Sequence, residues 1–137
     1  MSTVEDTSLI ERLGGEEAVR RWVDLFYALV KADEVLAPLF PDDLSLSREK
    51  QFAFFVQMLG GPPLYQERFG RPFLRFHHRK VRIGLIERDA WMRRVMESLR
   101  QVSSDEELIA YLERRIAPLA DHMINHHPES KNALFFN

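Results

Sequence analysis

Apolar residues recur at intervals of three or four in three long stretches of the chain, which is the spacing of amphipathic helices. The positions are Val19, Trp22, Val23, Phe26 and Val30 in the first stretch, Met92, Val95, Met96 and Leu99 in the second, and Leu108, Leu112, Ile116, Leu119 and Met123 in the third. They predict helices over 16–31, over 86–102, and from about 104 to about Asn125. No window alternates apolar and polar residues as a strand does. The pattern therefore predicts an all-α fold.

Prolines, glycines and capping residues predict where the other elements begin and end. Pro38 and Pro41 would interrupt a long helix, so we expect residues 33–43 to form a short helical turn and a loop around Phe40. A further helix is expected to begin at a cap formed by Ser45 or Ser47, and the sequence GGPP at 60–63 ends it. We expect 64–81 to be irregular, with about two helical turns over 73–79. An S-x-x-E pattern, Ser104 with Glu107, predicts a capping box for the last helix.

Size and composition predict one soluble domain. The 137 residues suit a single core over 1–137, with a polar leader at 1–12 and a C-terminal tail at 128–137. Nineteen basic and 21 acidic residues leave a net charge of −2, so no overall field favours nucleic acid or an anionic membrane. The chain has no cysteine, which excludes disulfides and thiolate ligands. Without an apolar run long enough to span a membrane or a signal-like start, the expected location is cytoplasmic.

Three hydrogen-bond donors lie beside the apolar stripes of three different helices. They are the hydroxyl of Tyr27, the amide of Gln51 and the indole of Trp91. Each has an ordinary explanation: a core tyrosine bonded to a backbone carbonyl, a half-exposed helix edge, and a packed tryptophan. Together they are also consistent with one cavity on which all three converge. Periodicity alone leaves both interpretations open, as it leaves open a helical bundle or a globin-like sandwich.

The segment RPFLRFHHRKVRIG at 71–84 combines two adjacent histidines with many basic residues. From 68 to 82 the cations are Arg68, Arg71, Arg75, Arg79, Lys80 and Arg82. Such a cluster is typical of a solvated face, of a phosphate or RNA site, or of a group of positive charges around a ligand that carries carboxylates. Zinc normally takes three or four protein ligands, whereas haem iron needs only one histidine. His122 and His126 also have metal-binding spacing, but histidines at a helix C-terminus are usually solvated.

Three sequence blocks, in this order and at this spacing, resemble the truncated haemoglobins of group II. They are LGGEEAVRRWVDLFY at 13–27, LGGPPLYQERFGRPFLRFHH at 59–78 and GLIERDAW at 84–91. The resemblance implies a shortened globin fold, a two-over-two helical sandwich, that encloses one haem b. It also implies that His78, six residues after Pro72, is the iron's protein ligand, with His77 as its neighbour.

The same resemblance assigns expected roles to further residues. Tyr27, Gln51 and Trp91 would surround the ligand, with Phe40 and Ser47 nearby. Contacts with the cofactor or its propionates would come from Lys50, Phe54, Phe55, Tyr65, Arg75 and Arg79. The chain departs from common globin patterns at Ser47, which stands where ordinary globins have a distal histidine. It also has Phe40 where some relatives carry a second tyrosine, and Gln51 where some carry an apolar residue.

The resemblance favours a protein that binds O₂ and related diatomic ligands for storage, transport or sensing. One alternative is a haem enzyme that turns over peroxide or detoxifies nitric oxide, and another is a haem-free module that binds through its basic cluster. An unidentified reductase is expected as a partner, nucleic acid and membranes are not, and the chain would be a monomer or a homodimer.

Overall fold

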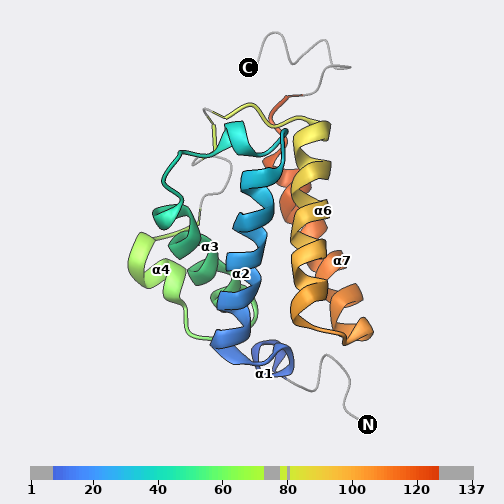
Figure 1. Ribbon diagram of the computed structural model, residues 1–137. Helices are drawn as coiled ribbons and strands as arrows, with labels where there is room; N and C mark the ends of the chain where they lie inside the picture. Colours follow the sequence, from blue (N-terminus) through green and yellow to red (C-terminus); the bar gives the residue numbers. More distant parts are fainter. Residues whose placement is uncertain (1–7, 73–77, 80, 127–137) are drawn as a thin grey trace.

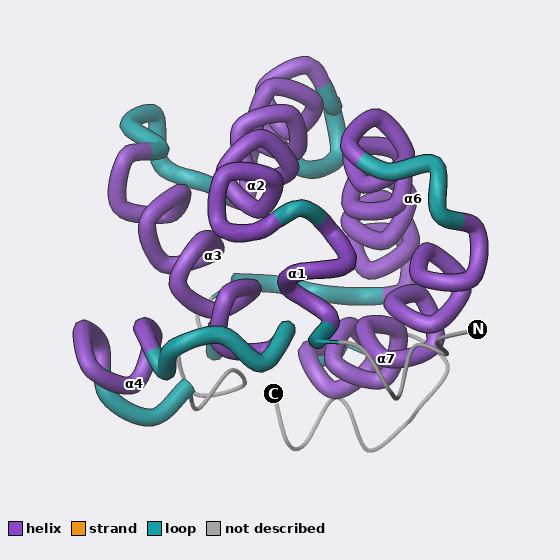
Figure 2. Tube along the Cα trace, turned by 90° about the horizontal axis from the view of Figure 1, so that it is seen from below, coloured by secondary structure: helices purple, strands orange, loops and turns teal. Residues whose placement is uncertain are grey.

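The computed structural model describes residues 8–72, 78–79 and 81–126, and this part of the chain is helical without strands. Its helices are α1 (Leu9–Leu13), α2 (Gly15–Ala32), α3 (Ser45–Met58), α4 (Leu64–Phe69), α6 (Leu85–Val102) and α7 (Glu106–Met123), with the 3₁₀ turn η1 (Ala37–Leu39). The helices α2, α3, α6 and α7 surround a common interior, with α2 beside both α3 and α6 and α7 packed on α6 (Figures 1 and 2). The predicted all-α class is confirmed. None of the helices in the described ranges is long and apolar enough to span a bilayer.

Trp22 joins three of the four long helices at the centre of the core. Its ring is fully buried and stacks on Phe55 of α3, with ring centroids 4.1 Å apart. Its indole N–H donates to the carbonyl of Val95 in α6 at 3.1 Å. This hydrogen bond satisfies the one polar atom of the buried side chain. The contact fixes α2 against both neighbours, and α2 carries Tyr27 from the same buried face.

The start of the chain contributes more structure than its polar composition suggests. Residues 9–12 of the expected leader belong to α1, whose Ile10 N–H donates to the carbonyl of Leu59 at 3.2 Å. Gly61 is required there, because an added Cβ would lie only 2.8 Å from a Val56 methyl and 2.9 Å from Ile10 Cδ1. The GGPP sequence therefore both ends α3 and makes room for α1.

Three local expectations were wrong. Residues 64–69 of the segment expected to be irregular form α4, in which Tyr65 and Phe69 pack at i, i+4 with ring centroids 5.3 Å apart. The residue before α3 is Leu44, and neither Ser45 nor Ser47 caps it with a side chain, because Asp43 accepts from the Ser45 N–H instead. The 73–79 helical turns lie mostly outside the described residues, as does the 128–137 tail.

The third error concerns the capping of α7. Asp105 caps this helix by accepting from the Leu108 N–H at 3.1 Å, and Ser104 is exposed. The guanidinium of Arg12 binds both carboxylate oxygens of Asp105 and reaches Glu107 at 3.2 Å. The expected capping-box glutamate is therefore an ion-pair partner of α1. A carboxylate stabilised by both a helix N-terminus and an arginine is a better cap than a hydroxyl.

Asp33 anchors the turn that leads from α2 to η1. Only 5% of its surface is exposed, and its carboxylate accepts from the N–H groups of Val35 and Leu36 and from Arg94 Nε of α6 at 2.8 Å. The Arg94 hydrogen bond, aided by the backbone donors, lowers the pKa of Asp33 below its ordinary value. The anchor places Leu36 and the following loop against α6.

We expect Asp33→Asn to lower the free energy of unfolding at pH 7 by about 1–3 kcal/mol, because bonds to an ionised acceptor are lost. A depressed folded-state pKa contributes stability above the unfolded pKa of about 4, and this contribution is lost as the pH falls through the folded value. The variant should therefore lose less stability than the parent chain between pH 5 and 2. Urea unfolding at several pH values measures this, with the exposed Asp24→Asn as the control. Parallel pH profiles for all three chains would contradict the assignment.

Candidate functional site

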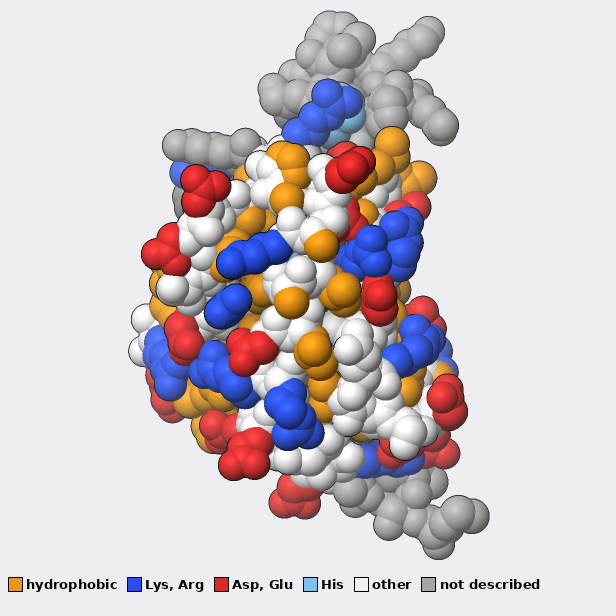
Figure 3. All heavy atoms as spheres, in the orientation of Figure 1, with side chains coloured by type: hydrophobic (Ala, Val, Ile, Leu, Met, Phe, Trp, Pro, Cys, Tyr) orange, Lys and Arg blue, Asp and Glu red, His pale blue; other side chains and the backbone are white. Residues whose placement is uncertain are grey.

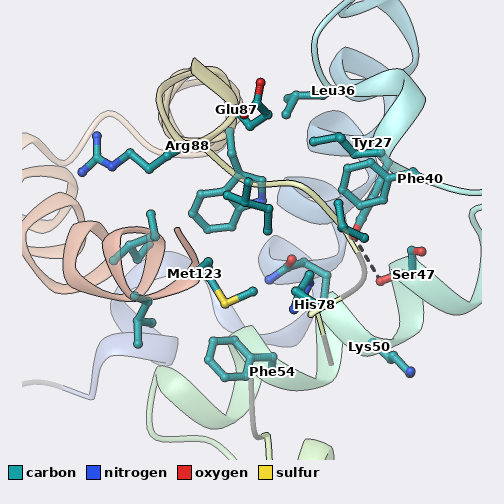
Figure 4. Close-up of a pocket in the computed structure, with 18 of the residues that line it drawn as sticks. Tyr27, Leu36, Phe40, Ser47, Lys50, Phe54, His78, Glu87, Arg88 and Met123 are labelled. Carbon is teal, nitrogen blue, oxygen red and sulfur yellow. Dashed lines mark hydrogen bonds between the residues drawn. The ribbon is translucent and has the colours of Figure 1, made fainter. Parts of the chain in front are cut away.

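A cavity of about 320 Å³ lies between α3, α6 and α7, and its lining is mostly apolar (Figure 4). Its size is within the range of small-molecule sites. The lining combines aromatic, aliphatic and a few polar side chains from every element except α1, namely Tyr27, Leu36, Leu39, Phe40, Pro41, Ser47, Lys50, Gln51, Phe54, Phe55, Tyr65, His78, Val81, Ile83, Glu87, Arg88, Trp91, Ile116, Leu119, Ala120 and Met123.

Most residues predicted from the sequence meet at this cavity. Tyr27, Phe40, Ser47, Lys50, Gln51, Phe54, Phe55, Tyr65, His78 and Trp91 all line it. Arg79 is exposed on the turn after His78 and does not belong to the lining. Arg75 and His77 lie outside the described residues. Side chains from α2, α3, α4, α6, the loop after η1 and the turn before α6 therefore share one space.

Tyr27 is held by aromatic rings and one hydrogen bond. Its ring meets Phe26 and Phe40 edge-on, at centroid distances of 4.9 and 5.6 Å. The hydroxyl donates to the backbone carbonyl of Ser47 at 3.3 Å, a long and therefore weak bond (Figure 4). Burial raises the pKa of Tyr27 well above its ordinary value, although the positive charge of Arg48 acts in the opposite direction. The hydroxyl consequently remains a proton donor at any ordinary pH.

Gln51 and Trp91 contribute donors of a different kind. Both side chains are half-buried and border the cavity from α3 and α6. Trp91 is held edge-on by Phe26, with ring centroids 6.0 Å apart. Within the described part of the chain, neither side chain hydrogen-bonds to a protein group, so both can donate to a molecule in the cavity.

His78 is the histidine of the cavity, into which its half-buried ring points from the turn before α6 (Figure 4). The turn is closed by a bond from the Val81 N–H to the His78 carbonyl at 3.0 Å. Among the described residues, no three histidine or acidic side chains are grouped to hold a metal ion. The His122 and His126 pair forms no site there, because His122 is exposed and His126 Nε2 lies 2.8 Å from Arg82.

Two arginines of the basic cluster have side-chain partners among the described residues. Arg68 lies 3.6 Å from Glu49 of α3, and Arg82 contacts His126. On the face of the molecule drawn in Figure 3, acidic and basic side chains are mixed. Of these two contacts, that of Arg68 pairs a cation with a carboxylate, whereas Arg75 and Lys80 of the cluster lie outside the described residues.

One wall of the cavity was missed in the sequence. Ile116, Leu119, Ala120 and Met123 follow one face of α7 at i, i+3, i+4 and i+7. Their spacing predicted a buried face of the helix. The spacing alone does not show whether such a face packs against other side chains or borders a cavity. Glu87 and Arg88 of α6 were also missed, although Glu87 accepts from the Gly84 N–H at 2.6 Å and so starts that helix.

Comparison with known proteins identifies the family. Residues 8–125 match the model of the bacterial-like globins. The chain is 39% identical over 111 residues to group 2 truncated hemoglobin YjbI of Bacillus subtilis, a match covering 81% of this chain and 84% of that one. The chain belongs to the group II truncated haemoglobins. The expected family and its two-over-two fold are thereby confirmed.

Solved structures of truncated haemoglobins agree with this assignment. The hemoglobin of the thermophilic phototroph Chloroflexus aurantiacus has a TM-score of 0.83 and 40% identity, covering 88% of this chain and 99% of that chain. The truncated oxygen-avid haemoglobin of Bacillus subtilis has a TM-score of 0.81 and 36% identity, covering 86% and 99%.

Membership in a globin family implies a haem cofactor, and the cavity of this truncated haemoglobin suits one chemically. The macrocycle of haem is apolar, and the lining is mostly aromatic and aliphatic. His78 provides an imidazole, the usual protein ligand of globin iron. Lys50 adds a positive charge to the lining, and its Nζ lies 5.7 Å from the centre of the Phe69 ring.

Proposed function

We propose that this truncated haemoglobin holds one haem b and binds O₂ and related diatomic ligands reversibly, with His78 as the single protein ligand of the iron. The observation that carries the proposal is the convergence of one imidazole and three hydrogen-bond donors on a single, largely apolar cavity. When bound, ferrous haem supplies the metal centre to which a diatomic ligand attaches. The oxygen avidity named for the Bacillus subtilis structure supports the choice of O₂.

The three donors would stabilise the ligand by hydrogen bonds. A diatomic ligand that gains electron density on binding would accept hydrogen bonds from these side chains well. At a net gain of about 1 kcal/mol for each bond, two or three bonds would slow release by roughly thirty- to somewhat more than a hundredfold. Gln51 and Trp91 can donate at once, whereas Tyr27 must first leave the Ser47 carbonyl, so its net gain is reduced by that weak bond.

The remaining predicted residues would hold the cofactor. Phe40, Phe54 and Phe55 offer apolar contacts to the macrocycle. Lys50 and Tyr65 are the propionate partners that the structure favours, because both border the cavity. Burial raises the pKa of Tyr65, which keeps its hydroxyl protonated and able to donate. Arg79 is proposed only as a positive charge beside His78, since its side chain is exposed and does not line the cavity.

Titration of the haem-free chain with hemin tests the proposal. We expect a Soret shift that saturates at one equivalent, together with quenching of tryptophan fluorescence. Phe54→Ser, which removes an apolar ring from the lining, should weaken hemin binding about tenfold or more, because burying a phenyl group contributes about 1.5–3 kcal/mol. Leu46→Ser is the matched control, since Leu46 is 58% exposed on the same helix. Hemin spectra that do not change on addition of the parent chain would contradict the proposal.

A further inference from the structure

The turn that carries His78 is bound to the end of α7 through the side chain of Asn125. The amide nitrogen of Asn125 donates to the Val81 carbonyl at 2.7 Å and approaches the His78 carbonyl at 3.4 Å. The amide oxygen accepts from the Ile83 N–H at 2.8 Å. These partners are 42 to 47 residues from Asn125 in sequence, so the contact is tertiary.

Backbone bonds complete the same junction. The N–H groups of Asn125 and His126 both donate to the Ile83 carbonyl, at 2.8 and 3.1 Å. Ile83 is 8% exposed and borders the cavity, so the junction lies directly behind the lining. Together these bonds hold the N–H and the carbonyl of Ile83. They also hold the carbonyls of His78 and Val81, the first and last residues of the turn.

Asparagine suits this position because residues 81–84 contain both N–H donors and carbonyl acceptors that need hydrogen-bond partners. Residues 81–84 have no helical or strand structure, and therefore no ladder of their own. A primary amide presents donors and an acceptor at the end of one short side chain. Aspartate would retain the acceptor but place a charged oxygen against two carbonyls, and alanine would remove both functions.

We propose that Asn125 is a positioning residue for His78, fixing the backbone from which the imidazole reaches into the cavity. The His78 carbonyl accepts from Val81 in the turn and lies within reach of Asn125, so the peptide that follows His78 is restrained from two directions. Asn125 does not line the cavity, and any effect on the iron must pass through this backbone. The inference rests on the proposed function in that it takes His78 as the iron ligand.

The consequence is that the end of α7 controls the geometry of the bond between His78 and the iron. Loss of the Asn125 amide would let the turn adopt several positions, and the imidazole would meet the iron at a range of distances and tilts. Second-sphere groups that orient a metal-bound histidine typically change affinity by 10- to 100-fold when removed. We expect the spectroscopic signature of the iron–histidine bond to respond more than global stability does.

Asn125→Ala and Asn125→Asp test this, with Arg82→Ala as the matched control. The control removes the neighbouring Arg82–His126 contact but leaves the carbonyl partners of Asn125 intact. In the ferrous, ligand-free state, resonance Raman spectroscopy should show the iron–histidine stretching band shifted or broadened in both Asn125 variants. Hemin transfer to an excess of haem-free acceptor globin should become about tenfold faster. Arg82→Ala should behave as the parent chain does in both measurements.

A haem-free measurement separates this inference from the proposed function. In the apo-chain, hydrogen exchange of the Ile83 amide should become at least about tenfold faster in Asn125→Ala, since that N–H loses its acceptor. Unchanged Raman bands and unchanged hemin loss, with only a lowered melting temperature, would overturn the positioning role. A parent chain that takes up hemin but shows no iron–histidine band would overturn the proposed function, whatever the exchange result for Ile83.

Discussion

Replacing His78, the proposed protein ligand of the iron, by alanine is expected to remove most of the specific affinity for haem. Hemin would keep only its apolar contacts with the cavity, so we expect binding at least about a hundredfold weaker, equivalent to a loss of about 3 kcal/mol or more. The measurement is hemin titration, followed by the absorption spectrum of the reduced complex. Free imidazole at millimolar concentration should restore much of the parent spectrum, because the space left by the side chain admits it.

Two control variants separate ligation from general effects of histidine removal. His122→Ala changes an exposed histidine of α7 and should leave hemin affinity unchanged. His77→Ala tests the neighbour that the sequence also offered. Parent-like haem binding by His78→Ala, combined with loss of binding by His77→Ala, would transfer the ligand role to the adjacent residue and contradict the assignment.

Replacing Tyr27 by phenylalanine is expected to speed the release of O₂ about tenfold. Phenylalanine keeps the edge-on contacts with Phe26 and Phe40 but removes the hydroxyl. A hydrogen bond to a charged acceptor contributes about 1.5–3 kcal/mol. The weak bond to the Ser47 carbonyl that Tyr27 gives up reduces this gain, and a net change of about 1.4 kcal/mol corresponds to a factor of ten in rate. Stopped-flow displacement of O₂ by excess CO measures the effect. Tyr111→Phe is the matched control, since Tyr111 lies on α7 outside the cavity lining.

The pH dependence of release tests the protonation of the same residue. Burial raises the pKa of Tyr27 well above the ordinary tyrosine value of about 10, so its hydroxyl should remain a donor through that pH. The O₂ release rate of the parent chain should therefore stay constant from pH 7 to about 10. An unchanged rate in Tyr27→Phe would show instead that the hydroxyl stays on the Ser47 carbonyl and takes no part in binding the ligand.

The long helices could be predicted from the sequence because each buries one continuous stripe. The spacing of Trp22, Phe26 and Val30 determines which face of α2 is apolar, and the structure buries that face. Local rules failed where a neighbour in space changed the outcome. Asp105 rather than Ser104 caps α7 because Arg12, far away in sequence, pairs with it. Residues 64–69 form a short helix between Pro63 and Gly70, in which Tyr65 and Phe69 pack one turn apart.

The site was predictable only to the extent that a family pattern could be recognised. Tyr27, Gln51 and Trp91 were suggestive as donors beside apolar stripes, but periodicity could not show that they share one cavity. The Asn125 junction left no sequence signal, because its partners are backbone groups that any residue at 78, 81 or 83 would provide. Interactions of this kind become visible only when the tertiary structure brings the two segments together.

The central proposal is that this cavity holds one haem, that His78 is the protein ligand of its iron, and that the haem binds diatomic ligands. The absorption spectra of the purified chain in its ferric, ferrous and CO-bound forms test this most directly. The account predicts a Soret band in each form, a ferrous spectrum of iron with one histidine ligand, and a clear shift on addition of CO. A chain that stays colourless after addition of hemin, or a ferrous spectrum that CO leaves unchanged, would contradict it.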